Sequence, residues 1–130
     1  MKSLILFVSG RQTDAHELAQ IVKDLPLLIH HVETLRQARF RLPRHDYQVI
    51  LTEAQLPDGN WLDVMHLVRE DPRDLAVIVT DPHADARFWS EALNVGAYDL
   101  LAQPFYPPEV RRILGNACSR LATAGRYSAG

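Results

Sequence analysis

The sequence predicts an α/β protein in which a five-stranded parallel sheet carries helices on both faces. Five short apolar runs recur along the chain, and a segment with helical periodicity follows each of them; the runs are 4–8, 27–32, 49–51, 75–79 and 98–102. Uninterrupted apolar runs are typical of strands that are buried on both faces. Strands that alternate with helices form a parallel sheet through right-handed crossovers, which place helices against the sheet. We therefore expect a doubly wound sheet of five strand–helix units.

Size and composition agree with one globular domain. The 130 residues can bury a core of their own, and the hydrophobic fraction of 47% is ordinary. The formal net charge of -2 gives no global reason to expect nucleic acid as a partner. No apolar run approaches the roughly 18 residues of a membrane-spanning helix. The single cysteine, Cys118, excludes an internal disulfide and fits a reducing compartment. We expect a cytoplasmic protein that contacts neither membrane nor nucleic acid directly.

The first two helices have recognisable start and stop signals. Either Thr13 or Asp14 is expected to cap the first helix, because Asp14 and Glu17 have capping-box spacing. Pro26 ends that segment before the second strand. Thr34 is expected to cap a basic second helix. Proline at position 43 ends it.

The three remaining helices also have start or stop signals in the sequence. The third begins near Trp61, which we expect to be buried. The fourth covers roughly 84–94, with Gly96 placed to terminate it. Two prolines at 107 and 108 suit the first turn of the last helix. The domain is expected to span residues 1–122, and the small, polar residues 123–130 to form a flexible tail or the start of a linker.

An acidic residue stands at the end of the third strand. Glu53 follows the apolar run 49–51, and a tight turn made by Pro57, Asp58 and Gly59 comes next. Ligands of open α/β sheets bind at the carboxyl ends of the strands. The chemistry of the protein is therefore expected near Glu53.

Three segments give a more specific signal. They are the turn Leu56-Pro57-Asp58-Gly59, the strand Val77-Ile78-Val79-Thr80, and Gly96-Ala97-Tyr98-Asp99-Leu100-Leu101-Ala102-Gln103-Pro104-Phe105. In order and spacing, these segments resemble the receiver domains of response regulators in two-component signalling. The likeness covers nearly the whole chain. It implies a flavodoxin-like (βα)5 fold, with Pro57 and Pro104 as loop or cis-proline candidates.

The resemblance also implies a phosphorylation pocket, which this sequence does not retain. The acid pair that holds Mg²⁺ in the family falls on Ser9 and Gly10, and the phosphoacceptor aspartate falls on Glu53. The charge-neutralising lysine falls on Gln103, whereas the hydroxyl residue, Thr80, is kept. Phosphoryl transfer depends on positioning and on neutralisation of charge by metal and cation.

These departures predict that the family chemistry is absent. We expect no catalytic residues, no metal site, and weak or absent Mg²⁺ affinity, since Mg²⁺ needs several hard oxygen ligands. Glu53 carries its carboxylate one methylene further than aspartate would, so it is either a partial mimic of the phosphorylated state or an acid in a pocket that has drifted. Gln103 either hydrogen-bonds Glu53 or fills space. The family's switch position falls on Leu100.

The resemblance implies a protein partner: a histidine kinase, an output domain or another receiver. The expected contact surface is the fourth helix, fifth strand and fifth helix, through which a homodimer is one option. Trp89 is expected to turn to the side or outward on the fourth helix, while partial burial is the alternative. Arg111 and Arg112 are further interface candidates.

Three alternatives stay open. The first is a receiver that is phosphorylated by an atypical route. The second is a flavodoxin-like enzyme or ligand-binding domain that uses Glu53, Thr80 and Asp81, although the segment after the first strand has one glycine and no phosphate loop. The third is that the chain is the front of a longer regulator with a DNA-binding or ATPase output.

Overall fold

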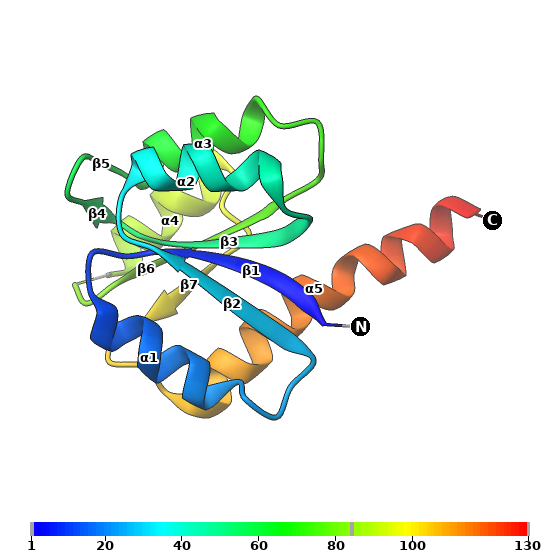
Figure 1. Cartoon of the computed structure of the whole chain (residues 1–130), viewed down its shortest axis with the longest axis horizontal. Coiled ribbons are helices and arrows are strands. Elements are labelled where there is room, and N and C mark those ends of the chain that lie inside the picture. The colour runs from blue at the N-terminus through cyan, green and yellow to red at the C-terminus, as the bar shows by residue number, and fades with distance from the viewer. Residues whose placement is uncertain (1, 84, 130) are drawn as a thin grey trace.

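The computed structural model describes residues 2–83 and 85–129, with side chains up to residue 120. Its centre is a five-stranded sheet in the order β2-β1-β3-β6-β7, and every neighbouring pair is parallel (Figure 1). The strands are β1 (Ser3–Val8), β2 (Leu27–Val32), β3 (Tyr47–Glu53), β6 (Ala76–Asp81) and β7 (Asp99–Ala102). The predicted fold class is confirmed.

Helices cover both faces of the sheet (Figure 1). One face carries α1 (Gln12–Ile21) and α5 (Pro107–Ala129), and the other carries α2 (Leu35–Arg41), α3 (Trp61–Arg69) and α4 (Ala86–Val95). Side chains of a strand point alternately to the two faces, so β1 sends Leu6 and Val8 into one core and Ile5 and Phe7 into the other. Because both faces are buried, the strands read as continuous apolar runs.

The start of α1 differs from the prediction. Arg11 occupies the N-cap and makes no side-chain cap hydrogen bond, while Thr13 and Asp14 lie inside the first turn. The predicted cap was wrong because the chain turns earlier: the Arg11 N–H donates to Ser9 Oγ at 3.0 Å. This local hydrogen bond starts the helix directly after a short loop.

The start of α2 has the predicted cap and a second one. Thr34 Oγ1 accepts a hydrogen bond from the Gln37 N–H at 3.0 Å, which confirms Thr34 as the N-cap. In addition, the carboxylate of Asp58 accepts from the N–H groups of Leu35 at 2.8 Å and Arg36 at 3.0 Å. A 3-10 turn, η1 (Leu42–Arg44), contains the proline that ends α2. The turn after β3 is thereby tied to α2.

Two short strands, β4 (Gln55–Leu56) and β5 (Gly59–Asn60), form a hairpin around the predicted tight turn. A Cβ atom on Gly59 would lie 2.6 Å from Asp63 Oδ2, so no larger residue fits there without a shift. Asp63 and Asn60 form the capping box that begins α3. Trp61 is buried, as predicted.

The end of the chain contains the predicted glycine stop and a long last helix. Gly96 ends α4 with φ of 122°, a conformation that favours glycine. The helix α5 continues to Ala129 and projects beyond the sheet (Figure 1). That residues 123–130 form a tail or begin a linker stays a prediction. Among the described residues, no helix has both the length and the apolar character to cross a bilayer.

Candidate functional site

A cavity opens at the carboxyl edge of the sheet, where β1, β3 and β6 end side by side. Its volume is about 420 Å³. The lining includes the predicted positions Gly10, Glu53, Pro57 and Thr80, together with residues from the loops around them: Arg11, Ala54, Gln55, Asp81, Pro82 and His83. The strand order thus brings most of the predicted pocket together, because adjacent parallel strands end at the same edge.

Glu53 is buried and held by a serine from the neighbouring strand end. Its exposed fraction is 8%, and Ser9 Oγ, which is fully buried, donates a hydrogen bond to Glu53 Oε1. The Ser9 carbonyl oxygen accepts from His31 Nε2 at 2.7 Å, so the ring nitrogen at that position carries the proton. The loop after β1 is therefore fixed to β2 on one side and to the end of β3 on the other.

Thr80 has the expected hydroxyl group, but this hydroxyl donates its hydrogen bond to the backbone and not into the cavity. The side chain is fully buried, and Oγ1 donates to the Leu101 carbonyl oxygen at 2.7 Å. A hydroxyl has one proton to donate. In this arrangement the Thr80 proton therefore binds the backbone of β7 and is directed away from the cavity.

Gln103 does not join Glu53. It lines a smaller neighbouring cavity of about 240 Å³, with Arg11, Asp14 and Glu17. Its Nε2 atom is buried and has no hydrogen-bond partner among the described residues. The amide NH₂ is the group that a glutamine would offer to a carboxylate, so the alternative in which Gln103 hydrogen-bonds Glu53 is wrong. The Gln103–Pro104 bond is cis, as predicted for Pro104, whereas Pro57 follows a trans bond.

The structure adds residues that the sequence did not single out. Arg11 lines both cavities and brings a cation to the loop after β1. His83 also lines the cavity, and its backbone N–H donates to Asp81 Oδ1 at 3.0 Å. The signal for Arg11 was its place directly after the first strand, since that loop borders the carboxyl edge of such sheets.

The donor set does not fit a magnesium ion. The ion takes an octahedral shell of hard oxygens, in proteins with one or two carboxylates placed for it. The cavity carboxylates are Glu53, which accepts from Ser9, and Asp81, which accepts from a backbone N–H. No group of three His, Cys, Asp or Glu side chains that could hold a metal occurs in the described part of the chain.

A separate surface exposes large apolar side chains. Trp89 on α4 is 41% exposed, so it turns outward as predicted. Three more exposed apolar residues come from α4 and the segments flanking β7: Leu93, Tyr98 and Tyr106. Leu100 is 1% exposed and belongs to the core, so it cannot contact a partner directly.

The two arginine candidates on α5 differ. Arg111 Nη1 lies 2.6 Å from Asp24 Oδ1 and also donates to the Ile21 carbonyl oxygen at 3.1 Å. Arg111 therefore joins α5 to the end of α1, and its part in an interface stays a prediction. Arg112 is exposed.

Comparison with known proteins identifies the family. The model of the response regulator receiver domain matches residues 5–114. This chain belongs to that family. A curated relative of this receiver domain is the response regulator protein PilR of Pseudomonas aeruginosa, which is 25% identical over 82% of this chain and 24% of its own length. The regulatory protein LuxO of Vibrio cholerae is 30% identical over 72% of this chain and 20% of its own length. The receiver domain thus spans about a quarter or less of these relatives.

Solved structures of receiver domains have the same fold as this chain. The signal receiver domain of a putative LuxO repressor from Vibrio parahaemolyticus superposes with a TM-score of 0.89 at 26% identity, covering 100% of this chain and 99% of that chain. The beryllofluoride-activated NtrC4 receiver domain dimer superposes with a TM-score of 0.82 at 23% identity, over 90% of this chain and 97% of that one. The second likeness concerns the fold alone.

Proposed function

We propose that this receiver domain acts in two-component signalling as a protein-interaction module that does not depend on phosphorylation. We propose further that it is not an enzyme and that it works in the cytoplasm. The observation that carries the proposal is the hydrogen bond from Ser9 to the buried carboxylate of Glu53.

That hydrogen bond supports the proposal because it engages one of the two carboxylate oxygens that would have to react. A phosphoacceptor needs a carboxylate oxygen that faces solvent, metal and phosphoryl donor together. Here Glu53 is buried, its partner is a neutral hydroxyl in place of a metal-binding acid, and the lysine position holds Gln103 in another cavity. Weak or absent Mg²⁺ binding is part of the proposal.

The role proposed for Glu53 is structural. Its carboxylate links the loop after β1 to the end of β3 through Ser9. This role differs from that of a phosphorylation mimic, because a mimic would change the α4 and β7 surface when its charge is removed.

Glu53→Gln separates these two roles. Glutamine keeps an oxygen that accepts from Ser9 but carries no charge. We predict that the amide spectrum of residues 86–102 stays unchanged in the Glu53→Gln protein, as measured by two-dimensional NMR. Shifts concentrated in α4 and β7 would instead support the mimic.

The partner surface proposed is formed by α4, β7 and α5. Exposed aromatic residues are common in the energetically important part of interfaces, and Trp89 with Leu93 lies one helical turn apart on α4. A histidine kinase, an output domain or another receiver would fit this surface. One similar structure is a receiver domain dimer by its name, which supports a second copy of the chain as one partner.

The experiment that tests the proposal is incubation with acetyl phosphate and Mg²⁺, followed by intact-mass spectrometry. We expect no gain of a phosphoryl group. Phosphorylation would favour the atypical receiver, and a small molecule that copurifies in the cavity of Glu53, Thr80 and Asp81 would favour a ligand-binding domain.

A further inference from the structure

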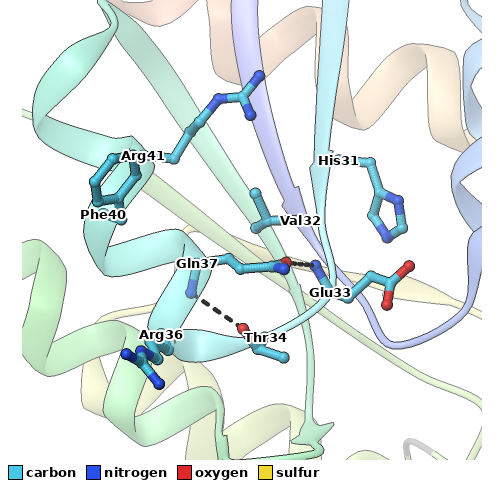
Figure 2. Close-up of a pocket in the computed structure, with 8 residues that line it drawn as sticks. All are labelled: His31, Val32, Glu33, Thr34, Arg36, Gln37, Phe40 and Arg41. Carbon is cyan, nitrogen blue, oxygen red and sulfur yellow. Dashed lines mark hydrogen bonds between the residues drawn. The ribbon is translucent and has the colours of Figure 1, made fainter.

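A second surface, at the opposite edge of the sheet from β7, has the character of a binding groove. It lies between the edge strand β2 and the helix α2, with a volume of about 770 Å³ (Figure 2). The groove is lined by His31, Val32, Glu33, Thr34, Arg36, Gln37, Phe40 and Arg41. The term basic groove is used below for this set.

The helix side of the basic groove is positive and aromatic. At 100° per residue, α2 buries Leu35 and Ala38 and exposes Arg36, Gln37 and Phe40 on its outer face, while Arg41 is half-buried at the border of that face. The segment 36–45 holds four arginines and no acidic residue, in a chain whose net charge is -2. This charge is local and is not shared by the rest of the protein.

These cations lack carboxylate partners. Neither Arg36 nor Arg41 forms an ion pair with any residue whose side chain is described. The Nε atom of Arg41 is buried and has no hydrogen-bond partner among those residues. The acid of the groove, Glu33, is engaged by Gln12 Nε2 at 2.7 Å. Arg41 also interacts with the hydroxyl of the buried Tyr47, so the exposed Arg36 is the more accessible of the two cations.

Phe40 adds an apolar contact to the same face. It is 62% exposed, and the guanidinium of Arg44 lies 3.6 Å from its ring centroid. Arginine and aromatic residues are enriched where proteins meet other proteins. The exposed ring offers an apolar anchor to a ligand whose other groups are anionic.

The strand side of the groove is an open sheet edge. Within the described residues, β2 pairs with β1 alone. The Val32 carbonyl accepts from the Ser9 N–H at 3.0 Å, so the backbone of Val32 faces β1 and that of its neighbours His31 and Glu33 faces outward. The Glu33 N–H donates a hydrogen bond to Gln37 Oε1 at 2.7 Å, as Figure 2 shows, and so cannot pair with an added strand. The backbone N–H and carbonyl groups of Ile29 and His31 point outward and can pair with an added strand.

We propose that the basic groove binds an extended acidic segment of a partner protein, which adds to the edge of β2 and places its carboxylates against Arg36 and Arg41. Addition of an extended segment to a sheet edge is a general mode of peptide recognition. Alternate side chains of a strand are about 6.6 Å apart, and Arg36 and Arg41 are separated by about 7.5 Å along a helix axis. Acidic residues at every second position match that spacing.

The test uses a labelled, N-acetylated peptide of alternating glutamate and valine, titrated into the whole chain at low salt. We expect amide shifts at residues 29–33 and 36–41, and Arg36→Glu to weaken binding roughly tenfold or more. The milder substitution Arg41→Gln should weaken it as well. Lys23→Glu, an exposed lysine just beyond α1 with the same change in charge, should leave the affinity unchanged.

Several results would overturn the proposal. They are absence of peptide binding, shifts confined to other surfaces, equal affinity of Arg36→Glu and Lys23→Glu, and equal affinity of a peptide with glutamine in place of glutamate. Binding of a short DNA duplex or of inorganic phosphate in preference to the peptide would assign the basic groove to another ligand. Amide spectra of the variants show independently that they are folded.

Discussion

Two side chains, Ser9 and Glu53, set the character of the pocket at the sheet edge. They come from strands that are neighbours in space but 44 positions apart in the sequence. A buried carboxylate without a hydrogen bond would be costly, and the Ser9 hydroxyl supplies that bond. An aspartate at position 9 would instead place two acids side by side, an arrangement that needs a cation. The neutral serine therefore makes the pocket stable without metal.

Ser9→Ala tests this role. Removal of the hydroxyl leaves the buried Glu53 carboxylate without its donor, and we predict a loss of about 1–3 kcal/mol in the free energy of unfolding. Urea denaturation at neutral pH measures it. Ser90→Ala on the exposed face of α4 is the matched control and should change stability little. Equal stability of the Ser9 variant and the wild type would contradict the role given to this hydrogen bond.

At the scale of elements, the turn after β3 and the start of α2 behave as one unit through Asp58. Desolvation raises the pKa of this carboxyl, but hydrogen bonds from the backbone of Leu35, Arg36 and Asp58 itself outweigh that effect and lower the pKa below its ordinary value of 3.8. Since the folded pKa is below the unfolded one, the stabilisation is present above the unfolded pKa. It is lost as the pH falls through the folded value.

Asp58→Ala should therefore destabilise the protein in a pH-dependent way. We predict a loss of about 0.5–1 kcal/mol at neutral pH, the lower part of the range for helix caps, because the carboxylate is exposed. The difference between variant and wild type should shrink as the pH is lowered through the carboxyl range. Urea denaturation over a pH series measures it. A difference that stays constant down to the acid limit would show that the carboxylate charge has no part in the cap.

The elements themselves were largely predictable from sequence. Apolar runs and helix-terminating residues such as Pro26 and Gly96 act locally, so the positions of the strands and helices and the parallel sheet followed from them. The predicted Thr13 or Asp14 cap was wrong because the chain already turns at Ser9 and Arg11. The cap that Asp58 supplies to α2 and the hydrogen bond between Ser9 and Glu53 were missed, because they join distant residues that no local pattern relates.

At the scale of the whole molecule, the receiver domain presents two different surfaces. The apolar surface of α4 contains Trp89 and Leu93, whereas the basic groove contains Arg36, Phe40 and Arg41. The first suits an apolar partner and the second an acidic one. Under the proposed function, the domain would connect two proteins through these two surfaces without phosphorylation.

Trp89→Ala tests the apolar surface of α4. We predict that the wild-type chain self-associates weakly and that loss of Trp89 weakens the dimer by about 2 kcal/mol, or roughly 30-fold in affinity. Sedimentation equilibrium over a range of protein concentrations measures it. Phe40→Ala, which removes an exposed aromatic residue from the basic groove, is the control. If it weakened the dimer as much as Trp89→Ala, the interface would lie elsewhere.

The central claim, independence from phosphorylation, is tested most directly by intact-mass spectrometry of the wild-type chain after incubation with acetyl phosphate and Mg²⁺. The positive control is the combined variant Ser9→Asp, Gly10→Asp, Glu53→Asp and Gln103→Lys, which restores the family's acids and lysine. A Cβ atom at Gly10 meets Pro57 Cγ at 3.4 Å, an ordinary contact, so the first loop tolerates it. We predict a phosphoryl adduct on the combined variant and none on the wild type. A phosphoryl group on Glu53 of the wild-type chain would contradict the account.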